Sequence, residues 1–270
     1  MSGTLEELAS ARMHGAGNAF VIIDERTPHG VAHGELARRL CAADAGTGLD
    51  GVLVLERGIH TPWRMRVFNA DGGEAEMCGN GIRCVVRYLF EGGEIAGTCA
   101  IETLAGTIAC EVVSTEPTFQ VRVDLGEVRF PNDARDETLT GSPPVLFVRV
   151  EVGNPHAVVF CDDVTRADLP ALARRFAADE RFAGGTNVHA AQVSGPNELR
   201  ARHFERGVGE TAACGTGAVA VAAISVARGL VATPVRVLVP GGCLQVDWRP
   251  GGSAHLSGPA EWEPRTLATS

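Results

Sequence analysis

The feature that most constrains this chain is an internal repeat at a constant shift of 136 residues. Segments of both halves match without a gap, and Cys78 and Cys214 lie in one of these matches. The matching segments are Gly17-Asn18 with Gly153-Asn154, Leu36-Ala37-Arg38-Arg39 with Leu172-Ala173-Arg174-Arg175, Phe68 and Glu74 with Phe204 and Glu210, and Cys78-Gly79-Asn80-Gly81 with Cys214-Gly215-Thr216-Gly217. Matches in one order at one shift predict two copies of one fold.

The two copies predict the same order of elements. Each has a short strand, a surface helix, further strands, a polar loop, a buried helix and strands rich in β-branched residues. The helix expected over residues 218–227 is apolar almost all round, which is typical of a helix surrounded by protein. We therefore expect an α+β fold of two pseudo-symmetric domains, each a mostly antiparallel sheet curled around a central buried helix.

The repeat also predicts where the domains divide. Residues 1–125 form the N-terminal half and residues 126–261 form the C-terminal half. The join falls in the Pro-, Gly- and charge-rich stretch 126–144, which is typical of a surface connection. The tail 262–270 is too short for a domain and is expected to pack back on the first half.

Charge and composition exclude several functions. The net charge is −9 with no basic cluster, so neither nucleic acid nor an anionic membrane is an expected partner. No apolar run approaches the ~20 residues of a membrane span, and residues 1–11 lack the apolar core of a signal peptide, so a cytoplasmic location is expected. All 24 basic residues are Arg, which rules out a lysine Schiff base with pyridoxal phosphate. The predicted partner is a small-molecule substrate, handled without a cofactor.

Two of the eight cysteines differ from the rest. No C-x-x-C occurs, so no metal site is expected. Six cysteines are predicted to be packing residues: Cys41, Cys84, Cys99, Cys110, Cys161 and Cys243. Cys78 and Cys214 instead each precede a glycine-containing helix start, where free N–H groups bind anions and lower a thiol pKa.

A pair of such cysteines suits one reaction in particular. A substrate carboxylate held between two helix N-termini would place one sulfur on each side of the adjacent carbon. Removal of a proton from one face and delivery to the other is racemisation or epimerisation by two bases. The helix ends stabilise the carbanion electrostatically, and the two thiols move the proton.

Motifs along nearly the whole chain resemble those of diaminopimelate epimerase. They are Met13-His14-Gly15-Ala16-Gly17-Asn18, Asn69-Ala70-Asp71-Gly72, Met77-Cys78-Gly79-Asn80-Gly81, Gly153-Asn154-Pro155-His156, Thr186-Asn187-Val188, Glu205-Arg206-Gly207-Val208-Gly209-Glu210-Thr211 and Ala213-Cys214-Gly215-Thr216-Gly217. The resemblance implies two related domains with the site in the cleft between them. It also implies conversion of LL- to meso-2,6-diaminopimelate, on the route to lysine and cell-wall precursors, and a homodimer.

The resemblance further implies roles for individual residues. Cys78 and Cys214 match the acid/base pair, and the backbone anion cradle is matched by Gly79, Asn80, Gly215 and Thr216. Substrate-binding positions are matched by Asn18, Asn69, Asn154, Asn187, Glu205 and Arg206. His156 and Glu205 match residues that tune the two thiols. Arg206 is suited to a two-pronged grip on the distal carboxylate.

Two departures from the family pattern leave alternatives open. Ala19 stands where the family usually has Asp, and Gly51 stands where some members have a substrate-binding glutamine. A racemase of the same fold acting on another amino acid is therefore one alternative. A redox protein with a switchable Cys78–Cys214 disulfide is a second. Glu74 and Glu210 are expected to cap the two central helices.

Overall fold

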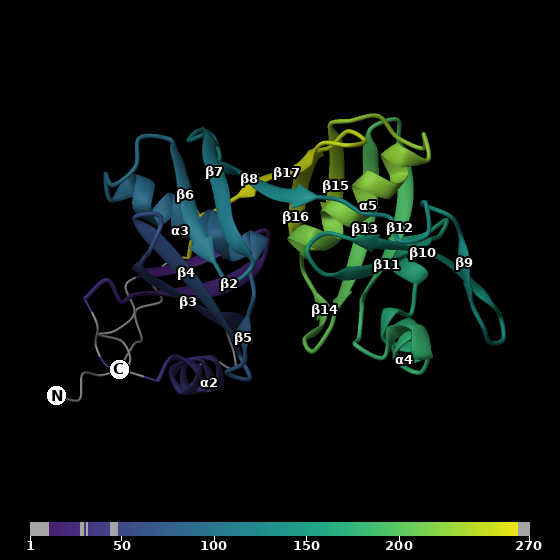
Figure 1. Cartoon of the computed structure of the whole chain (residues 1–270), viewed down its shortest axis with the longest axis horizontal. Coiled ribbons are helices and arrows are strands. Elements are labelled where there is room, and N and C mark those ends of the chain that lie inside the picture. The colour runs from purple at the N-terminus through teal and green to yellow at the C-terminus, as the bar shows by residue number, and fades with distance from the viewer. Residues whose placement is uncertain (1–10, 28–29, 31, 44–47, 264–270) are drawn as a thin grey trace. The chain divides into compact units, whose positions relative to one another are not determined.

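The computed structural model describes residues 11–27, 30, 32–43 and 48–263, and it divides into two compact units (Figure 1). The first unit comprises the described residues up to Val123 and those from Gly258 onward, and the second comprises Asp124–Ser257. The boundary thus falls two residues before the predicted one. Of the tail, Trp262 pairs with Met13 of the first unit, and residues 264–270 lie outside the described residues.

The described residues of the first unit form two helices and nine strands, and the unit also contains the end of a tenth strand. Its elements are β1 (Ala11–Gly15), β2 (Asn18–Asp24), α2 (His33–Ala43), β3 (Leu49–Arg57), β4 (Trp63–Asn69), β5 (Glu74–Ala75), α3 (Gly79–Glu91), β6 (Thr98–Thr103), β7 (Gly106–Ser114), β8 (Gln120–Glu127) and β18 (Glu261–Trp262), with the end of β17 (Ser253–Pro259). Strands β8 and β17 each contain a unit boundary, so the chain passes between the units within strands.

The second unit repeats this order. Its elements are β9 (Glu137–Leu139), β10 (Val145–Glu151), β11 (Pro155–Phe160), the 3-10 helices η1 (Val164–Arg166) and η2 (Glu180–Phe182), α4 (Leu169–Ala177), β12 (Asn187–Gly195), β13 (Glu198–Glu205), β14 (Gly209–Thr211), α5 (Gly215–Ala227), β15 (Val235–Val239) and β16 (Gly242–Asp247). Asp168 caps α4 by accepting Ala171 N–H, and Pro170 lies in the first turn of this helix.

Strand pairing is the same in the two units. β2 pairs with β1 antiparallel and with β3 parallel, and β11 pairs with β10 and β12 in the same two senses. Likewise β4 pairs antiparallel with β3 and parallel with β6, and β13 pairs antiparallel with β12 and parallel with β15. The remaining hairpins are antiparallel, which confirms the predicted α+β fold with mostly antiparallel sheets.

The two central helices occupy equivalent places among these strands (Figure 1). Helix α3 contacts β1, β2, β3, β4 and β7, and α5 contacts β10, β11, β12, β13, β15 and β16. Each spans thirteen residues. Ten residues of α5 are buried, as expected from its apolar sequence, and it buries most of its length inside the sheet.

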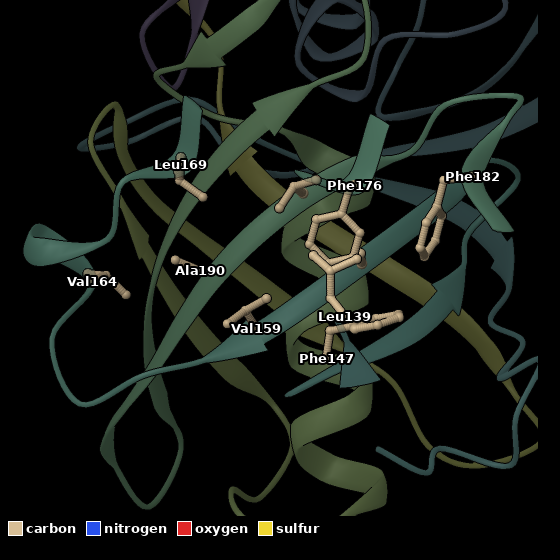
Figure 2. Packing of buried hydrophobic residues seen from close by; sticks show 10 residues of the cluster. Leu139, Phe147, Val159, Val164, Leu169, Phe176, Phe182 and Ala190 are labelled. Carbon is tan, nitrogen blue, oxygen red and sulfur yellow. The ribbon is translucent and has the colours of Figure 1, made fainter. Parts of the chain in front are cut away.

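The outer helices cover the far face of the strands that the central helices contact. Helix α2 packs on β3 and β4, and α4 packs on β12 and β13. Beneath α4, Phe147, Phe176 and Phe182 meet edge to face with ring centroids 5.0–5.6 Å apart, as Figure 2 shows within their cluster. Within the described residues, none of the helices has the length and apolar character that crossing a membrane requires.

Candidate active site

Both repeated cysteines are the N-cap residues of the central helices. Cys78 (φ −135°, ψ 112°) precedes α3, and Cys214 (φ −123°, ψ 115°) precedes α5. Each sulfur accepts a hydrogen bond from the third helical N–H: Gly81 N lies 3.4 Å from the Cys78 sulfur, and Gly217 N lies 3.3 Å from the Cys214 sulfur. The sulfur therefore takes the capping role that an oxygen usually fills, at the positive end of the helix.

The first half-site, the residues of the first unit near Cys78, contains a chain of hydrogen-bonded side chains with a charged group at each end. Arg83 Nη2 donates to Asn80 Oδ1 (2.9 Å), and Asn80 Nδ2 donates to Asn18 Oδ1 (2.7 Å). Asn18 Nδ2 then donates to Asp50 Oδ2 (2.8 Å), which also accepts Ala19 N–H. Every bond points from the guanidinium towards the carboxylate, so the two charges fix how both carboxamides are turned.

Sequence reasoning missed the part that Arg83 plays in this chain. Its side chain is fully buried and also donates to the backbone oxygens of Gly79 (2.9 Å) and Pro259 (3.0 Å). Burial lowers the pKa of Arg83 to about 10, which leaves it charged at neutral pH. The repeat does indicate that position 83 is buried, because the equivalent residue in α5 is Val219, which is fully buried.

Replacing Arg83 by Met is expected to destabilise the protein by about 2–4 kcal/mol, since buried acceptors lose their donor. Urea unfolding followed by circular dichroism measures the change. Arg87→Met is the matched control in the same helix. Arg87 is only half-buried, and it donates to one backbone oxygen, that of Ala260, and to the Glu91 carboxylate. Equal losses in the two variants would show that the Asn80–Arg83 contact has no special weight.

The second half-site surrounds Cys214, which is buried, whereas Cys78 is half-buried. Glu205 lies beside Cys214 and accepts the Thr211 hydroxyl (2.6 Å). Burial and then the Glu205 carboxylate raise the pKa of the Cys214 thiol well above its usual range, against the bonds from Gly217 and Thr216. The expected lowering of the thiol pKa is therefore wrong for Cys214, because desolvation outweighs the helix end.

Glu205→Gln is expected to lower the pKa of Cys214, because the amide keeps the shape of Glu205 but removes its charge. Each unit of lowering raises the thiolate fraction about tenfold below the pKa. Thiolate absorbance against pH, taken as the difference from the Glu205→Gln/Cys214→Ala double variant, isolates this sulfur. A titration that coincides with that of the parent protein would exclude Glu205 as a cause.

Hydrogen bonds hold the other predicted residues of this unit to neighbouring segments. Asn154 Oδ1 lies 2.7 Å from His156 Nε2. Asn187 donates to Pro155 O (3.1 Å) and accepts Arg206 N–H (2.9 Å), so it ties together two of the loops that carry predicted substrate contacts. Arg206 is exposed, and one of its N–H groups donates to Gly184 O (2.7 Å).

Asn69 is the remaining predicted residue of the first unit. It ends β4, opposite Gly51 of β3, and its backbone N–H donates to Gly73 O (2.9 Å). A Cβ atom on Gly51 would lie 2.6 Å from Phe68 O, so this strand position does not accept a larger residue without a shift. Ala19 is buried beside it in β2.

Two buried histidines were also missed. His156 Nδ1 lies 2.8 Å from His189 Nε2, and His189 Nδ1 lies 2.8 Å from His203 Nδ1. The rings of His189 and His203 pack against the start of α5. A Cβ atom on Gly217 would lie 2.6 Å from His189 Cε1 and 3.0 Å from His203 Nδ1. One histidine lies in each of three neighbouring strands, His156 in β11, His189 in β12 and His203 in β13, and no signal within a single strand brings them together.

Glu74 and Glu210 do not cap the central helices as expected. Arg66 donates to Glu74 (2.7 Å), and the repeat-equivalent Arg202 donates to Glu210 (2.8 Å). Each pair ties a short strand to its neighbour. Among the packing cysteines, Cys243 also differs from expectation, because it is exposed.

Metal binding finds no support in the part of the chain that the structure describes. There, no group of three or more His, Cys, Asp or Glu residues is arranged to hold a metal ion. The three histidines contact one another through their ring nitrogens instead of converging on a point.

Comparisons with known proteins show the family to which this fold and sequence belong. The family model for diaminopimelate epimerase matches residues 10–131 and 148–263. A diaminopimelate epimerase of Rhizorhabdus wittichii is 41% identical over 259 residues, covering 92% of this chain and 91% of the relative. Two solved structures share the fold at low identity. A PhzF-family phenazine biosynthesis protein of Bacillus anthracis has a TM-score of 0.73 at 15% identity, covering 94% and 96% of the two chains. A hydroxyproline epimerase of Agrobacterium vitis has a TM-score of 0.66 at 17% identity, covering 94% and 90%. With the sequence match spanning both repeats and both cysteines, the chain belongs to the diaminopimelate epimerase family.

Proposed function

We propose that this protein converts LL-2,6-diaminopimelate to meso-2,6-diaminopimelate by a two-base mechanism that uses its own thiols. The observation that carries the proposal is the pair of repeat-equivalent sulfurs, each capping a buried helix. Family membership and a relative named diaminopimelate epimerase support the substrate. The structural neighbours named for other substrates are 15–17% identical and support the fold alone.

In the proposed reaction, Cys78 and Cys214 act on opposite faces of one substrate Cα. One thiolate removes the Cα proton, and the other thiol delivers a proton to the opposite face. The substrate carboxylate lies at the first-turn N–H groups of both helices, those of Gly79-Asn80 and Gly215-Thr216. The negative charge that develops as the proton leaves is stabilised there by fixed dipoles, which is the larger part of the rate enhancement.

The surroundings of Cys214 suit a proton donor in the resting enzyme. Because burial and Glu205 disfavour the thiolate at Cys214, this residue holds its proton until a strong base, the substrate carbanion, is presented. The same charge drives the sulfur to regain a proton after transfer, which resets the site.

The polar residues around the two helices bind the rest of the zwitterion. Asn18 and Asn154 are equivalent in the repeat, and each bonds a buried side chain, Asn80 for Asn18 and His156 for Asn154. Asn69, Asn187 and Arg206 contact the distal end in this proposal. Arg206 uses one N–H on Gly184 O, so its other donors are suited to the distal carboxylate.

The two departures from the family pattern lie behind the binding residues in this proposal. Ala19 is buried, and its backbone N–H bonds Asp50, which in turn holds Asn18. Gly51 is confined by Phe68 O. Neither position therefore motivates a different amino acid as substrate. The homodimer and the cytoplasmic location stay predictions.

The proposal is tested with the purified, reduced protein and a panel of amino acids: LL- and meso-diaminopimelate, proline, hydroxyproline and glutamate. Chiral chromatography measures the stereoisomers formed without added cofactor. We expect interconversion of LL- and meso-diaminopimelate only. Turnover of another panel member with none of diaminopimelate would replace the proposed substrate, and no turnover of any would remove the proposed reaction.

A further inference from the structure

Three core positions are apolar in the first unit and histidine in the second. At the repeat shift of 136, the buried residues pair as Phe20 with His156, Leu53 with His189 and Val67 with His203. Leu53 and His189 lie at the same distance from the central helix of their unit. A Cβ atom on Gly81 would lie 2.6 Å from the Leu53 side chain, and a Cβ atom on Gly217 would lie 2.6 Å from the His189 side chain. Burying three imidazoles where aliphatic and aromatic side chains fit costs desolvation energy, so packing does not explain them.

The histidines form one hydrogen-bonded chain that starts at Asn154. It runs from Asn154 Oδ1 through His156 and His189 to His203, with contacts of 2.7, 2.8 and 2.8 Å. At its far end, the buried His203 Nε2 has no hydrogen-bond partner among the described residues. Burial lowers the pKa of His156 and His203 to about 3 and that of His189 well below its usual value, so the rings are uncharged at neutral pH.

Uncharged rings give this chain a direction. A neutral imidazole has one N–H and one lone pair. Because the Asn154 oxygen can only accept, His156 carries its proton on Nε2 and accepts at Nδ1 from His189 Nε2–H. His189 then accepts at Nδ1 from His203 Nδ1–H, which leaves a lone pair on His203 Nε2. The opposite direction would bury an N–H of His203 without an acceptor and would require the Asn154 amide to turn round.

We infer that His189 and His203 are positioning residues that act through His156 to hold the Asn154 carboxamide with its NH2 group turned towards the substrate. This rests on the proposed function, in which Asn154 binds diaminopimelate. Asn154 is half-buried, and its Nδ2 has no partner among the described residues, so it is available to an acceptor such as a carboxylate oxygen. In the first unit, Asn80 and Asp50 hold the equivalent Asn18 instead.

The first test measures the tautomers without substrate. Nitrogen-15 spectra of histidine-labelled protein distinguish protonated from unprotonated ring nitrogens, and single His variants assign them. At neutral pH we expect the proton on Nε2 of His156, on Nε2 of His189 and on Nδ1 of His203. The opposite set, or charged rings, overturns the inference. This measurement does not depend on turnover, so it stands even where diaminopimelate proves not to be the substrate.

The second test compares two variants of similar size, His203→Asn and His203→Leu. Asn places an amide N–H near the position of Nδ1–H and preserves the donor to His189, whereas Leu removes it. We expect His203→Leu to raise KM for LL-diaminopimelate about tenfold, equivalent to about 1.4 kcal/mol, with kcat changed less than about threefold. His203→Asn restores KM to within about threefold of the parent.

Two outcomes overturn the inference. One is the same KM in both variants, which would make the donor irrelevant. The other is an equal fall in kcat and kcat/KM in His203→Leu with unchanged tautomers of His156 and His189, which would indicate a role other than holding Asn154. Where His203→Leu does not fold, the tautomer measurement on the parent protein decides.

Discussion

Alanine in place of Cys78 or Cys214 is expected to lower kcat for epimerisation by about 10³–10⁴-fold, because each variant lacks one of the two groups that move the proton. Each cysteine lies at a helix start whose backbone N–H groups form the proposed anion cradle. The cradle N–H groups belong to the main chain and remain in both variants. We therefore expect KM to change far less than kcat, as measured by initial rates on LL-diaminopimelate.

The exposed Cys243 provides the matched control for this prediction. Cys243→Ala removes a thiol far in sequence from either helix start and is expected to retain kcat within about twofold. Serine variants at 78 and 214 separate shape from acidity, since a hydroxyl is a much weaker acid than a thiol. Full activity of Cys78→Ala or Cys214→Ala would remove that sulfur from the reaction.

Acidification is expected to destabilise the protein steeply, because three buried histidines must gain protons on unfolding. Their pKa values are about 3 for His156 and His203 and lower than usual for His189, against 6.5 for an unperturbed histidine. Well above pH 6.5 the three rings are uncharged in both the folded and the unfolded state, and their contribution to stability is greatest. As the pH falls from 6.5 towards 3, the unfolded state binds more protons, so stability falls by about 4 kcal/mol per pH unit for the three together.

The size of this effect makes it easy to measure. By pH 4.5 the loss is on the order of 8 kcal/mol, comparable with the whole stability of a typical domain. Urea unfolding between pH 5.0 and 6.5 gives the slope in a range where most carboxylates stay ionised. His203→Leu is expected to reduce the slope by about a third, and leucine at the exposed His60 serves as control. A slope near zero in the parent would contradict burial of the three rings.

The sequence predicts the fold well because each half repeats the same local patterns. The apolar run of α5 and the glycines after Cys214 are local signals, and the structure contains the helix that they predict. The matching strand pairs of the two units follow because equal patterns at one shift fold alike.

The parts that the sequence does not predict depend on burial. Arg83 reads as a solvent-exposed charge on a helix, yet its guanidinium joins Asn80 to the backbone inside the first unit. His189 and His203 lie on different strands and meet only after the sheet forms. The pKa of Cys214 was expected to fall at a helix end, and it rises because the thiol loses its water and meets Glu205.

The most direct test of the two-thiol mechanism is turnover of LL-diaminopimelate in deuterium oxide, stopped at early conversion. Mass spectrometry then measures deuterium at Cα in the meso product and in the recovered substrate. Two separate bases predict product with one deuterium at the inverted carbon, delivered by the second thiol, and substrate that still carries protium. Product that retains the original protium would show that a single base moves the proton across both faces, and it would contradict paired action of Cys78 and Cys214.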